Sequence, residues 1–476
     1  MNAATENLWS ASEAASATHG DTVGDWVASG VSIDTRTLNS GDLFIALRGP
    51  NHDGHDHVQD ALKKGAAAAV VERAYSNVPD NTDLLRVDDS EQALRDLAVH
   101  ARARTPAQIC GVTGSVGKTG TKELLSAALD AQGNVSATAG NLNNHYGLPL
   151  SLSRMPANTD YGIFEMGMNH AGEISPLSKL ARPDVAMIMS IESVHIENFD
   201  GIVGIADAKS EIFDGLLNGG TAVISRDTPF FDRLAERARE CGAAQVWGFG
   251  MHSLSNARFL AADPTPTGQH VQATIGSKHL KYHLSMRGRH WAINTLGVLA
   301  AVASLGADLD AAAQALVHVK PPKGRGEIHK VNAEDGAFAI VDETYNASPV
   351  AVRAAMEVLK NSSPGRGGRR VVVLGDMLEL GEDSEREHLS LANDITAHDF
   401  DLVFACGEYM PGILERLTDD MRGGAAPNSE ELAGLVAKRV RSGDLVLVKG
   451  SFGSQMGKVV SRLMAMDATR ETDGDA

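Results

Sequence analysis

The sequence predicts an α/β protein of three domains, and three observations support this fold class. The chain has 476 residues, more than one ordinary hydrophobic core accommodates. Short apolar stretches typical of strands alternate with stretches of helical periodicity along most of the chain. An apolar strand at 108–113 runs into a glycine-rich loop and then a helix, an order typical of doubly wound parallel sheets.

The first part of the chain predicts a small α/β domain behind a short lead-in. Residues 1–24 are rich in Ala, Ser, Thr and Asn, and we expect a loosely ordered segment there, with room for a short helix. In residues 25–104, strands are predicted at 42–47 and 67–71, and a helix at 58–64.

The central segment, residues 105–318, predicts a parallel, doubly wound sheet. A helix is expected at 118–131 and another at 291–305. Residues 258–286 alternate polar and apolar side chains, which predicts antiparallel strands appended to the sheet. The other strands expected after the glycine-rich loop are 161–166, 185–191, 221–225 and 245–250.

Pro321, Pro322 and Gly324 mark a boundary, because Pro and Gly interrupt regular structure. The third domain is therefore predicted over residues 319–476. Its expected strands, separated by helices as in a Rossmann-like α/β unit, are 338–342, 370–375, 402–407 and 445–449.

Composition excludes several classes of function. The net charge of −18 argues against nucleic acid as a partner, since such binding needs a basic face. Cys110, Cys241 and Cys406 are far apart and have no metal-site spacing, so they are expected to be reduced thiols. No apolar stretch is long enough for a membrane span and no signal peptide is visible. A soluble, cytoplasmic protein is expected.

The strongest local motif is the loop Gly114-Ser115-Val116-Gly117-Lys118-Thr119, named here the phosphate loop. Glycines let backbone N–H groups approach phosphate oxygens, and a helix N-terminus adds favourable partial charge. Lys118 is expected to reach the β and γ phosphates of ATP, and the Thr119 hydroxyl to bind Mg²⁺. The usual Walker spacing would place Gly where Val112 stands, so this is a shortened variant.

Three further side chains are candidates whose residue types leave alternatives open. Glu165 and His195 follow apolar strands, at the sheet edge where ligands bind, and a carboxylate there suits Mg²⁺. Taken alone, Glu165 also fits a capping or ion-pair residue, and His195 a hydrogen-bonded structural histidine. Lys209 lies in a helical segment and, taken alone, reads as a solvated lysine.

Nine segments occur in the order in which the motifs of the Mur ligases occur, and the chain resembles that family. A further stretch upstream, SIDTRTLNSGDLFIALRGPNHDGHDHV, resembles the family's uridine-nucleotide domain. The resemblance runs from about residue 31 to residue 464. The nine segments are GVTGSVGKTGTKELL, GNLNNHYGLPLSL, FEMGMNHAGEI, SVHIENF, AKSEIF, PPKGRGE, VDETYNASP, VVLGDMLELGEDSEREH and VLVKGSFGS.

The resemblance implies catalytic roles by position. Lys118 and Thr119 would bind the ATP phosphates and one Mg²⁺. Glu165 would bind magnesium, and His195 would help to hold a second Mg²⁺ ion. Lys209 matches a lysine that is carbamylated in the family, and its carbamate would support that second ion.

The resemblance also implies binding roles. Asn294 matches the adenine-side residue, and Arg325 and Asp342 match nucleotide-facing positions that the third domain contributes as it closes. The remaining matches are Thr35, Arg36 and Arg48 at the uridine diphosphate end, and Asn141, Asn143 and Asn144 in a polar loop near the reacting carboxylate.

Within the family, NNHYGLP, EMGMNHAGEI, YNASP and GDMLELG resemble the enzyme that adds D-alanyl-D-alanine. The resemblance therefore implies an ATP-dependent ligase, acting as a monomer, that joins this dipeptide to UDP-N-acetylmuramoyl-tripeptide through an acyl phosphate. Rival interpretations are another amide ligase of the same fold, such as a folate polyglutamylase, a P-loop ATPase or small-molecule kinase, and a non-catalytic nucleotide-binding regulator.

Some positions depart from the family pattern or fall outside it. The family often has Asn, Asp and Asn where this chain has Ser190, Glu343 and Ser348, and each difference puts one hydrogen bond in question. The histidines of the motif NHDGHDH are expected to lie in a turn and not to bind zinc, since no further ligands accompany them. They are His52, His55 and His57.

Overall fold

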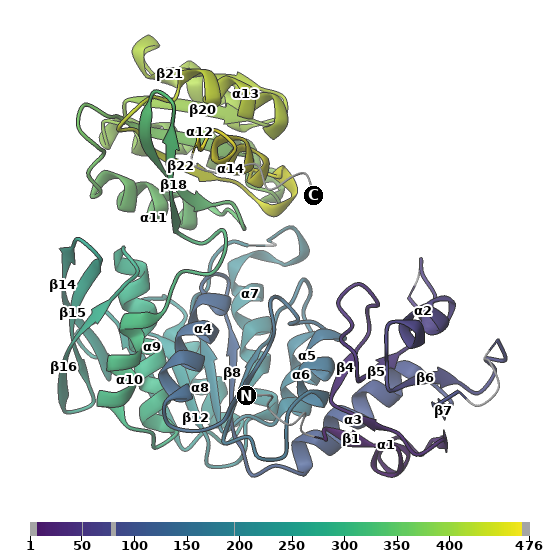
Figure 1. Cartoon of the computed structure of the whole chain (residues 1–476). Helices are drawn as coiled ribbons and strands as arrows, with labels where there is room; N and C mark the ends of the chain where they lie inside the picture. Colours follow the sequence, from purple (N-terminus) through teal and green to yellow (C-terminus); the bar gives the residue numbers. More distant parts are fainter. Residues whose placement is uncertain (1–6, 50, 78–81, 195, 469–476) are drawn as a thin grey trace.

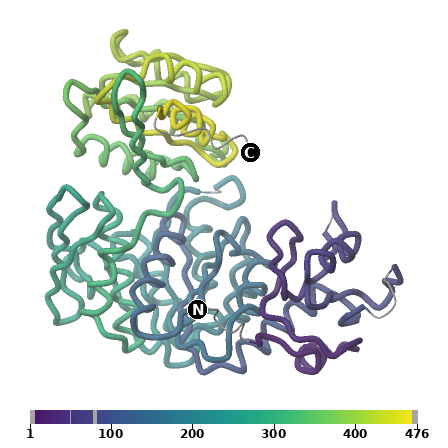
Figure 2. Tube along the Cα trace, viewed as in Figure 1, coloured from purple at the N-terminus to yellow at the C-terminus, as the bar shows by residue number. Residues whose placement is uncertain are grey.

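The computed structural model describes residues 7–49, 51–77, 82–194 and 196–468. Three α/β bodies follow one another along the chain, and the colours of Figures 1 and 2 separate accordingly. Each body has its own principal sheet, of five, nine and six strands. Among the described residues, no helix combines the length and apolarity that crossing a membrane requires.

The first body contains a mixed sheet with strand order β2-β7-β6-β5-β4. Helix α3 (Ser90–Ala103) packs its apolar side chains into the core of this body. Asp89 caps the helix by accepting hydrogen bonds from two backbone N–H groups of its first turn. The strands are β2 (Asp21–Val23), β4 (Gly30–Ser32), β5 (Asp42–Ile45), β6 (Ala68–Glu72) and β7 (Leu84–Val87), with α2 at Val58–Lys63.

The lead-in contains the short helix that was expected as possible there, but residues 7–24 are ordered and not loose. Residues 1–6 lie outside the described residues. This segment forms β1 (Trp9–Ser10), α1 (Ala11–Thr18) and β2, and β1 pairs with β3 (Val27–Ala28). The Trp9 side chain is fully buried, and its indole N–H donates to the carbonyl of Ser153 at 2.9 Å. One large aromatic residue orders a segment whose average composition suggests disorder.

Trp9→Ala is expected to lower the free energy of unfolding by about 3–5 kcal/mol, because it leaves a large cavity and an unpaired Ser153 carbonyl. Urea unfolding of the two proteins measures the difference. Leu254→Ala is the control, because Leu254 is 67% exposed, and its effect should stay within about 0.5 kcal/mol. Equal midpoints for Trp9→Ala and the unchanged protein would contradict the packing role.

The central body is a nine-stranded sheet of order β16-β15-β14-β13-β12-β11-β8-β10-β9. Its strands run parallel from β9 to β14, and β15 and β16 are antiparallel, as predicted. The short strand β9 (Val135–Ala137) was not predicted. The other strands are β8 (Gln108–Thr113), β10 (Tyr161–Glu165), β11 (Val185–Ile188), β12 (Thr221–Ser225), β13 (Gln245–Gly250), β14 (Ala257–Thr265), β15 (Gly268–Ile275) and β16 (Lys278–Leu284).

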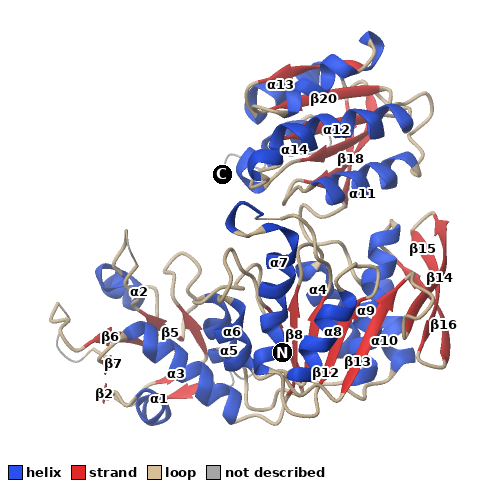
Figure 3. Ribbon diagram, turned by 180° about the vertical axis from the view of Figure 1, so that it is seen from behind, coloured by secondary structure: helices blue, strands red, loops and turns tan. Residues whose placement is uncertain are grey.

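Helices cover both faces of the central sheet (Figure 3), so β8, which lies between β10 and β11, is buried on both sides. Cys110 and Val112 of β8 point into one apolar cluster and Ile109 into the other, as strand alternation requires. One face is covered by α4 (Lys118–Asp130), α9 (Arg289–Ser304) and α10 (Leu309–Ala315), and the other by α5 (Gly147–Ser153), α6 (Ile174–Ala181), α7 (Gly201–Ser210) and α8 (Phe231–Glu240).

The third body is a six-stranded sheet of order β17-β18-β22-β19-β20-β21, with all neighbours parallel except β17 and β18. The four predicted strands are present as β18 (Gly336–Glu343), β19 (Arg370–Gly375), β20 (Leu402–Cys406) and β22 (Leu445–Lys449). The two edge strands, β17 (Glu327–Ala333) and β21 (Arg422–Ala426), were not predicted. The helices are α11 (Pro349–Lys360), α12 (Ser384–Ala397), α13 (Ser429–Arg439) and α14 (Gly457–Met464).

Candidate active site

The phosphate loop leaves the carboxyl end of β8 and enters α4 at Lys118. Gly114 and Gly117 have φ of +153° and +89°, conformations that favour glycine. A Cβ at Gly114 would lie 3.0 Å from the Cβ of Met189. The Lys118 ammonium donates to the carbonyl of Gly114 at 2.7 Å, so the lysine side chain folds back over the loop.

Ser190, one of the departures from the family pattern, attaches the phosphate loop to the segment after β11. Its hydroxyl accepts a hydrogen bond from the N–H of Val116 at 2.9 Å and donates to the Val116 carbonyl at 3.1 Å. Its own carbonyl accepts from the N–H of Ser115 at 2.9 Å. The Ser190 hydroxyl therefore bonds both the backbone N–H and the backbone carbonyl of Val116.

Glu165, at the end of β10, lies at the centre of a polar cluster next to the loop. Its carboxylate accepts from the hydroxyl of Thr119 at 2.9 Å and from the side-chain amide of Asn143 at 2.7 Å. The residue is only 1% exposed. A hydroxyl and a carboxylate facing each other beside a phosphate loop form an oxygen donor set that suits Mg²⁺.

Lys209, on α7, is buried and not solvated. It is 4% exposed, so the interpretation of a solvent-facing helix lysine is wrong. Burial lowers the pKa of the Lys209 amine well below its usual value, and the charge of Lys118 lowers it further. Burial also lowers the pKa of Lys118, and the negative charge of Glu165 partly offsets this lowering. His195 lies outside the described residues.

The linker into the third body brings Arg325 to the phosphate loop. Arg325 Nη2 donates to the hydroxyl of Thr119 at 3.2 Å, and its guanidinium lies 3.9 Å from the centroid of the Tyr345 ring. The flanking residues Gly324 and Gly326 have φ of +71° and +98°, which allows the tight turn that points Arg325 back to the central body. Arg325 and Thr119, 206 positions apart in sequence, are thus joined through the Thr119 hydroxyl.

A cavity of about 480 Å³ opens between these groups. Several of its lining residues were not predicted to contact the nucleotide, and they come from three separate elements: the start of α9, the loop after β18 and the end of β22. They include Trp291, Tyr345 and Lys449. The predicted residues that line the cavity are Ser115, Val116, Gly117, Lys118, Thr119, Asn141, Asn143, Glu165, Asn294 and Arg325, together with the departures Ser190, Glu343 and Ser348.

Asp342 does not line this cavity, and its nucleotide-facing role on closure of the third domain stays a prediction. Its Oδ1 accepts from the N–H and the hydroxyl of Thr344 at 3.0 and 2.6 Å. The next residue, Glu343, lines the cavity instead, because successive side chains of a strand point to opposite faces. The Glu343 carboxylate pairs with the buried Lys449 ammonium at 3.2 Å.

Asn144 lies beside Asn143 in the polar loop before α5, and its expected role near the reacting carboxylate stays a prediction. Its side-chain oxygen accepts from the N–H of Gly147 at 2.9 Å, at the start of α5. It therefore serves the helix N-terminus, whereas its neighbour Asn143 reaches Glu165.

A second cavity, of about 1200 Å³, lies between the first and central bodies. Thr35 and Arg36 line it, as does Arg154 at the end of α5. Arg48 does not line it, because its guanidinium pairs with Asp53 at 3.0 Å and with Glu72 at 3.1 Å.

The histidines of NHDGHDH lie at a turn, as expected. His55 and His57 belong to a 3₁₀ turn at Gly54–His57. The ring of His55 contacts the Asp53 carboxylate through Nδ1 at 2.6 Å and accepts from the N–H of Glu72 at Nε2. Both of its nitrogens are therefore used in local structure.

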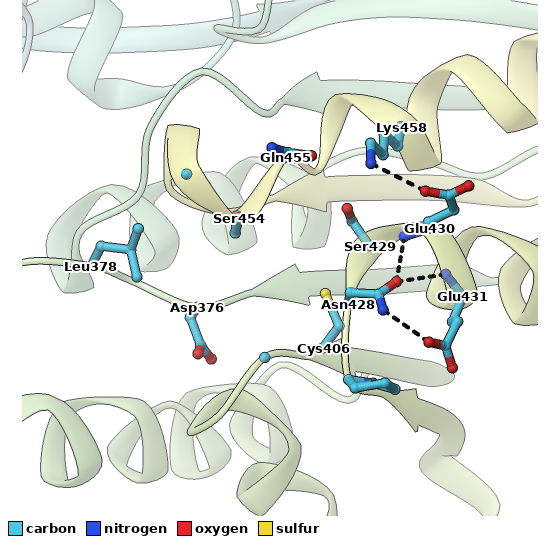
Figure 4. Close-up of a pocket in the computed structure, with 13 residues that line it drawn as sticks. Asp376, Leu378, Cys406, Asn428, Ser429, Glu430, Glu431, Ser454, Gln455 and Lys458 are labelled. Atoms are coloured by element: carbon cyan, nitrogen blue, oxygen red, sulfur yellow. Dashed lines mark hydrogen bonds and ion pairs between the residues drawn. The ribbon is translucent and has the colours of Figure 1, made fainter.

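Figure 4 shows a third cavity, of about 690 Å³, inside the third body. It lies at the carboxyl ends of β19 and β20, next to the N-terminus of α13. Asp376 lines it, and the carboxylate of Asp376 accepts from the N–H groups of Glu408 and Met410. The predicted site residues do not line this cavity.

Family models match the three bodies in turn. The model described as "Mur ligase family, catalytic domain" matches residues 27–102, "Mur ligase middle domain" matches 112–302, and "Mur ligase, glutamate ligase domain" matches 324–452. A UDP-N-acetylmuramoyl-tripeptide–D-alanyl-D-alanine ligase of Rickettsia prowazekii is 34% identical over 90% of this chain and 94% of its own length. The chain belongs to the Mur ligase family.

Solved structures of Mur ligases support this membership. A MurF crystal structure from Acinetobacter baumannii has a TM-score of 0.83 at 28% identity, covering 96% of this chain and 99% of that one. MurF ligase from Thermotoga maritima in complex with ADP has a TM-score of 0.76 at 28% identity, covering 93% and 98%. The three-body α/β architecture of this chain is that of these Mur ligases.

Proposed function

We propose that the chain is an ATP-dependent ligase that joins D-alanyl-D-alanine to UDP-N-acetylmuramoyl-tripeptide, giving the UDP-linked pentapeptide, ADP and phosphate. The observation that carries the proposal is the meeting of Lys118, Thr119 and Glu165 with Arg325 of the third-domain linker in one cavity. Relatives named for this reaction match nine-tenths of the chain or more.

The chemistry begins with activation of a carboxylate. A free carboxylate is a poor acylating agent, so the tripeptide's terminal carboxylate oxygen attacks the γ-phosphorus of ATP, and ADP leaves. Lys118 is placed to neutralise charge on the transferred phosphoryl group. The dipeptide amine then attacks the acyl carbon of the acyl phosphate, and phosphate leaves from the tetrahedral intermediate.

Two Mg²⁺ ions are proposed to accompany ATP. Thr119 and Glu165 present oxygen ligands for one of them, and His195 and a carbamylated Lys209 are proposed for the second. Bound Mg²⁺ stabilises negative charge on phosphoryl oxygens. The lowered pKa of Lys209 favours the neutral amine, the form that captures CO₂.

The uridine diphosphate end of the substrate is proposed to bind in the cavity lined by Thr35 and Arg36. Arg48 is proposed to join them by exchanging its ion pairs with Asp53 and Glu72 for phosphate oxygens. ATP and a UDP-linked precursor are cytoplasmic substrates, and one chain supplies the proposed groups from all three bodies. We therefore propose a monomeric, cytoplasmic enzyme.

Product formation is expected to require both D-alanyl-D-alanine and UDP-tripeptide. Incubation with ATP, Mg²⁺ and each substrate alone or together, read by product mass, tests this expectation. Phosphate release without an amine acceptor would favour the ATPase or kinase reading. Equal efficiency with single D-amino acids would favour a different ligase of the family. Parallel reactions with the diaminopimelate and lysine tripeptides identify the preferred third residue.

ATP and UDP-tripeptide together are expected to draw the third domain inward, because Arg325 on its linker already contacts Thr119 of the phosphate loop. Small-angle X-ray scattering should show a smaller radius of gyration with both ligands than with neither. Arg325→Ala is expected to weaken this response, because it removes the guanidinium that joins the two bodies. A radius that does not change in the unaltered protein would contradict the closure.

A further inference from the structure

Three side chains with metal-binding atoms gather on the first hairpin of the third body. Glu327 and His329 lie on β17 and Asp342 lies on β18, and one ligand atom from each lies within 4.8 Å of the others. Glu327 and Asp342 are directly opposite each other in the antiparallel register. His329 projects from the same face as Glu327, two residues along. These three residues do not line the cavity of about 480 Å³ beside the phosphate loop, named here the nucleotide cavity.

The distances suit ligands of one ion better than they suit hydrogen bonds. His329 Nε2 lies 3.7 Å from a carboxylate oxygen of Glu327 and 3.7 Å from Oδ2 of Asp342, beyond hydrogen-bond range. Ligand atoms about 2.1 Å from a tetrahedral ion lie roughly 3.4 Å apart. Small side-chain rotations would therefore bring all three atoms onto one centre.

Electrostatics also point to a cation at this position. Two carboxylates directly opposite on neighbouring strands repel each other. Asp342 is 5% exposed, and Thr344 occupies its Oδ1 with two hydrogen bonds. Among the described residues, the structure gives Oδ2 only the longer contact with His329. A cation held between the imidazole and the two carboxylates would offset the repulsion between the carboxylates.

We propose that Glu327, His329 and Asp342 bind a divalent transition-metal ion. Imidazole with carboxylates suits Zn²⁺ and neighbouring first-row metals, whereas Mg²⁺ prefers an all-oxygen, octahedral set. The ion would join the start of β17 to the end of β18 immediately after Arg325. It would thus fix the third-domain end of the linker through residues that do not line the nucleotide cavity, independently of the proposed reaction.

Calorimetric titration of the full chain with Zn²⁺, without nucleotide and with millimolar Mg²⁺ present, tests the site. One equivalent should bind to the unaltered protein, and His329→Gln should bind it at least tenfold more weakly. His170→Gln is the matched control, because His170 lies 3.3 Å from Glu173 but belongs to no such group of three. Glu165→Gln reports on binding at the catalytic carboxylate. Both controls should retain the equivalent.

Thermal unfolding separates loss of the site from loss of the fold. Without metal, His329→Gln and the unaltered protein should melt together, and Zn²⁺ should raise the melting temperature of the unaltered protein only. The proposal is overturned if His329→Gln keeps full affinity, if Glu165→Gln loses the same equivalent, or if no Zn²⁺ binds to the unaltered protein.

Discussion

Lys118→Ala is expected to lower turnover by about 10²–10³-fold while leaving the fold intact. The change removes the point charge proposed to face the β and γ phosphates, and charge stabilisation of that kind typically contributes this much. The loss of stability should be small, because the ammonium is buried and burial lowers its pKa. Its hydrogen bond is to a single carbonyl, that of Gly114.

Steady-state kinetics and thermal unfolding of Lys118→Ala measure the two effects separately. Lys458→Ala is the control, because Lys458 lies on α14 in a surface ion pair with Glu430, and its turnover should be unchanged. Normal turnover in a normally stable Lys118→Ala protein would mean that the loop is only structural.

Lys209→Ala is expected to lose most activity and to recover part of it when short-chain carboxylates are added. An unmodified ammonium would repel Mg²⁺, whereas a carbamate offers anionic oxygen ligands. Lys209→Arg should be inactive and should not be rescued, because a guanidinium keeps its proton and forms no carbamate. Near-normal turnover of Lys209→Ala without a response to carboxylates would remove the carbamate role and leave the ligase proposal standing.

The same lysine predicts a pH effect on stability. The folded-state pKa of Lys209 is lowered, so the unfolded chain binds more protons, and its contribution to stability rises with pH until the pKa of the unfolded lysine is reached. Lys209→Met removes that dependence. In CO₂-depleted buffer near neutral pH, Lys209→Met is therefore expected to unfold at a temperature no lower than that of the unaltered protein.

Short-range patterns predicted the strands that carry the phosphate loop and Glu165, because a buried parallel strand is a continuous apolar run. The edge strand β21, with the sequence RGGAA, has no such pattern, and its pairing with β20 depends on the rest of the sheet. The ordered N-terminal segment depends on Trp9 meeting Ser153, a contact far apart in sequence.

The site residues also fall into two groups, those predicted from a local motif and those placed by packing between distant segments. Lys118 and Thr119 belong to a local motif, so their positions follow from the loop itself. The burial of Lys209 and the side chains of Tyr345 and Lys449 in the cavity result from packing between distant segments. Asp342 and Glu343 are adjacent, and only the register of β18 decides which of them faces the nucleotide cavity.

Helix α5 lies between the two cavities proposed to hold ATP and the UDP-linked peptide. Asn143, in the nucleotide cavity, precedes it, and Arg154, in the cavity between the first and central bodies, ends it. All seven residues of the helix are buried, so its length of about 10 Å is a fixed spacing between the two cavities. The helix thus sets the distance between the two cavities. With the UDP end in the second cavity as proposed, a UDP-linked peptide one residue shorter or longer would bring its carboxylate to the wrong distance from the phosphate loop.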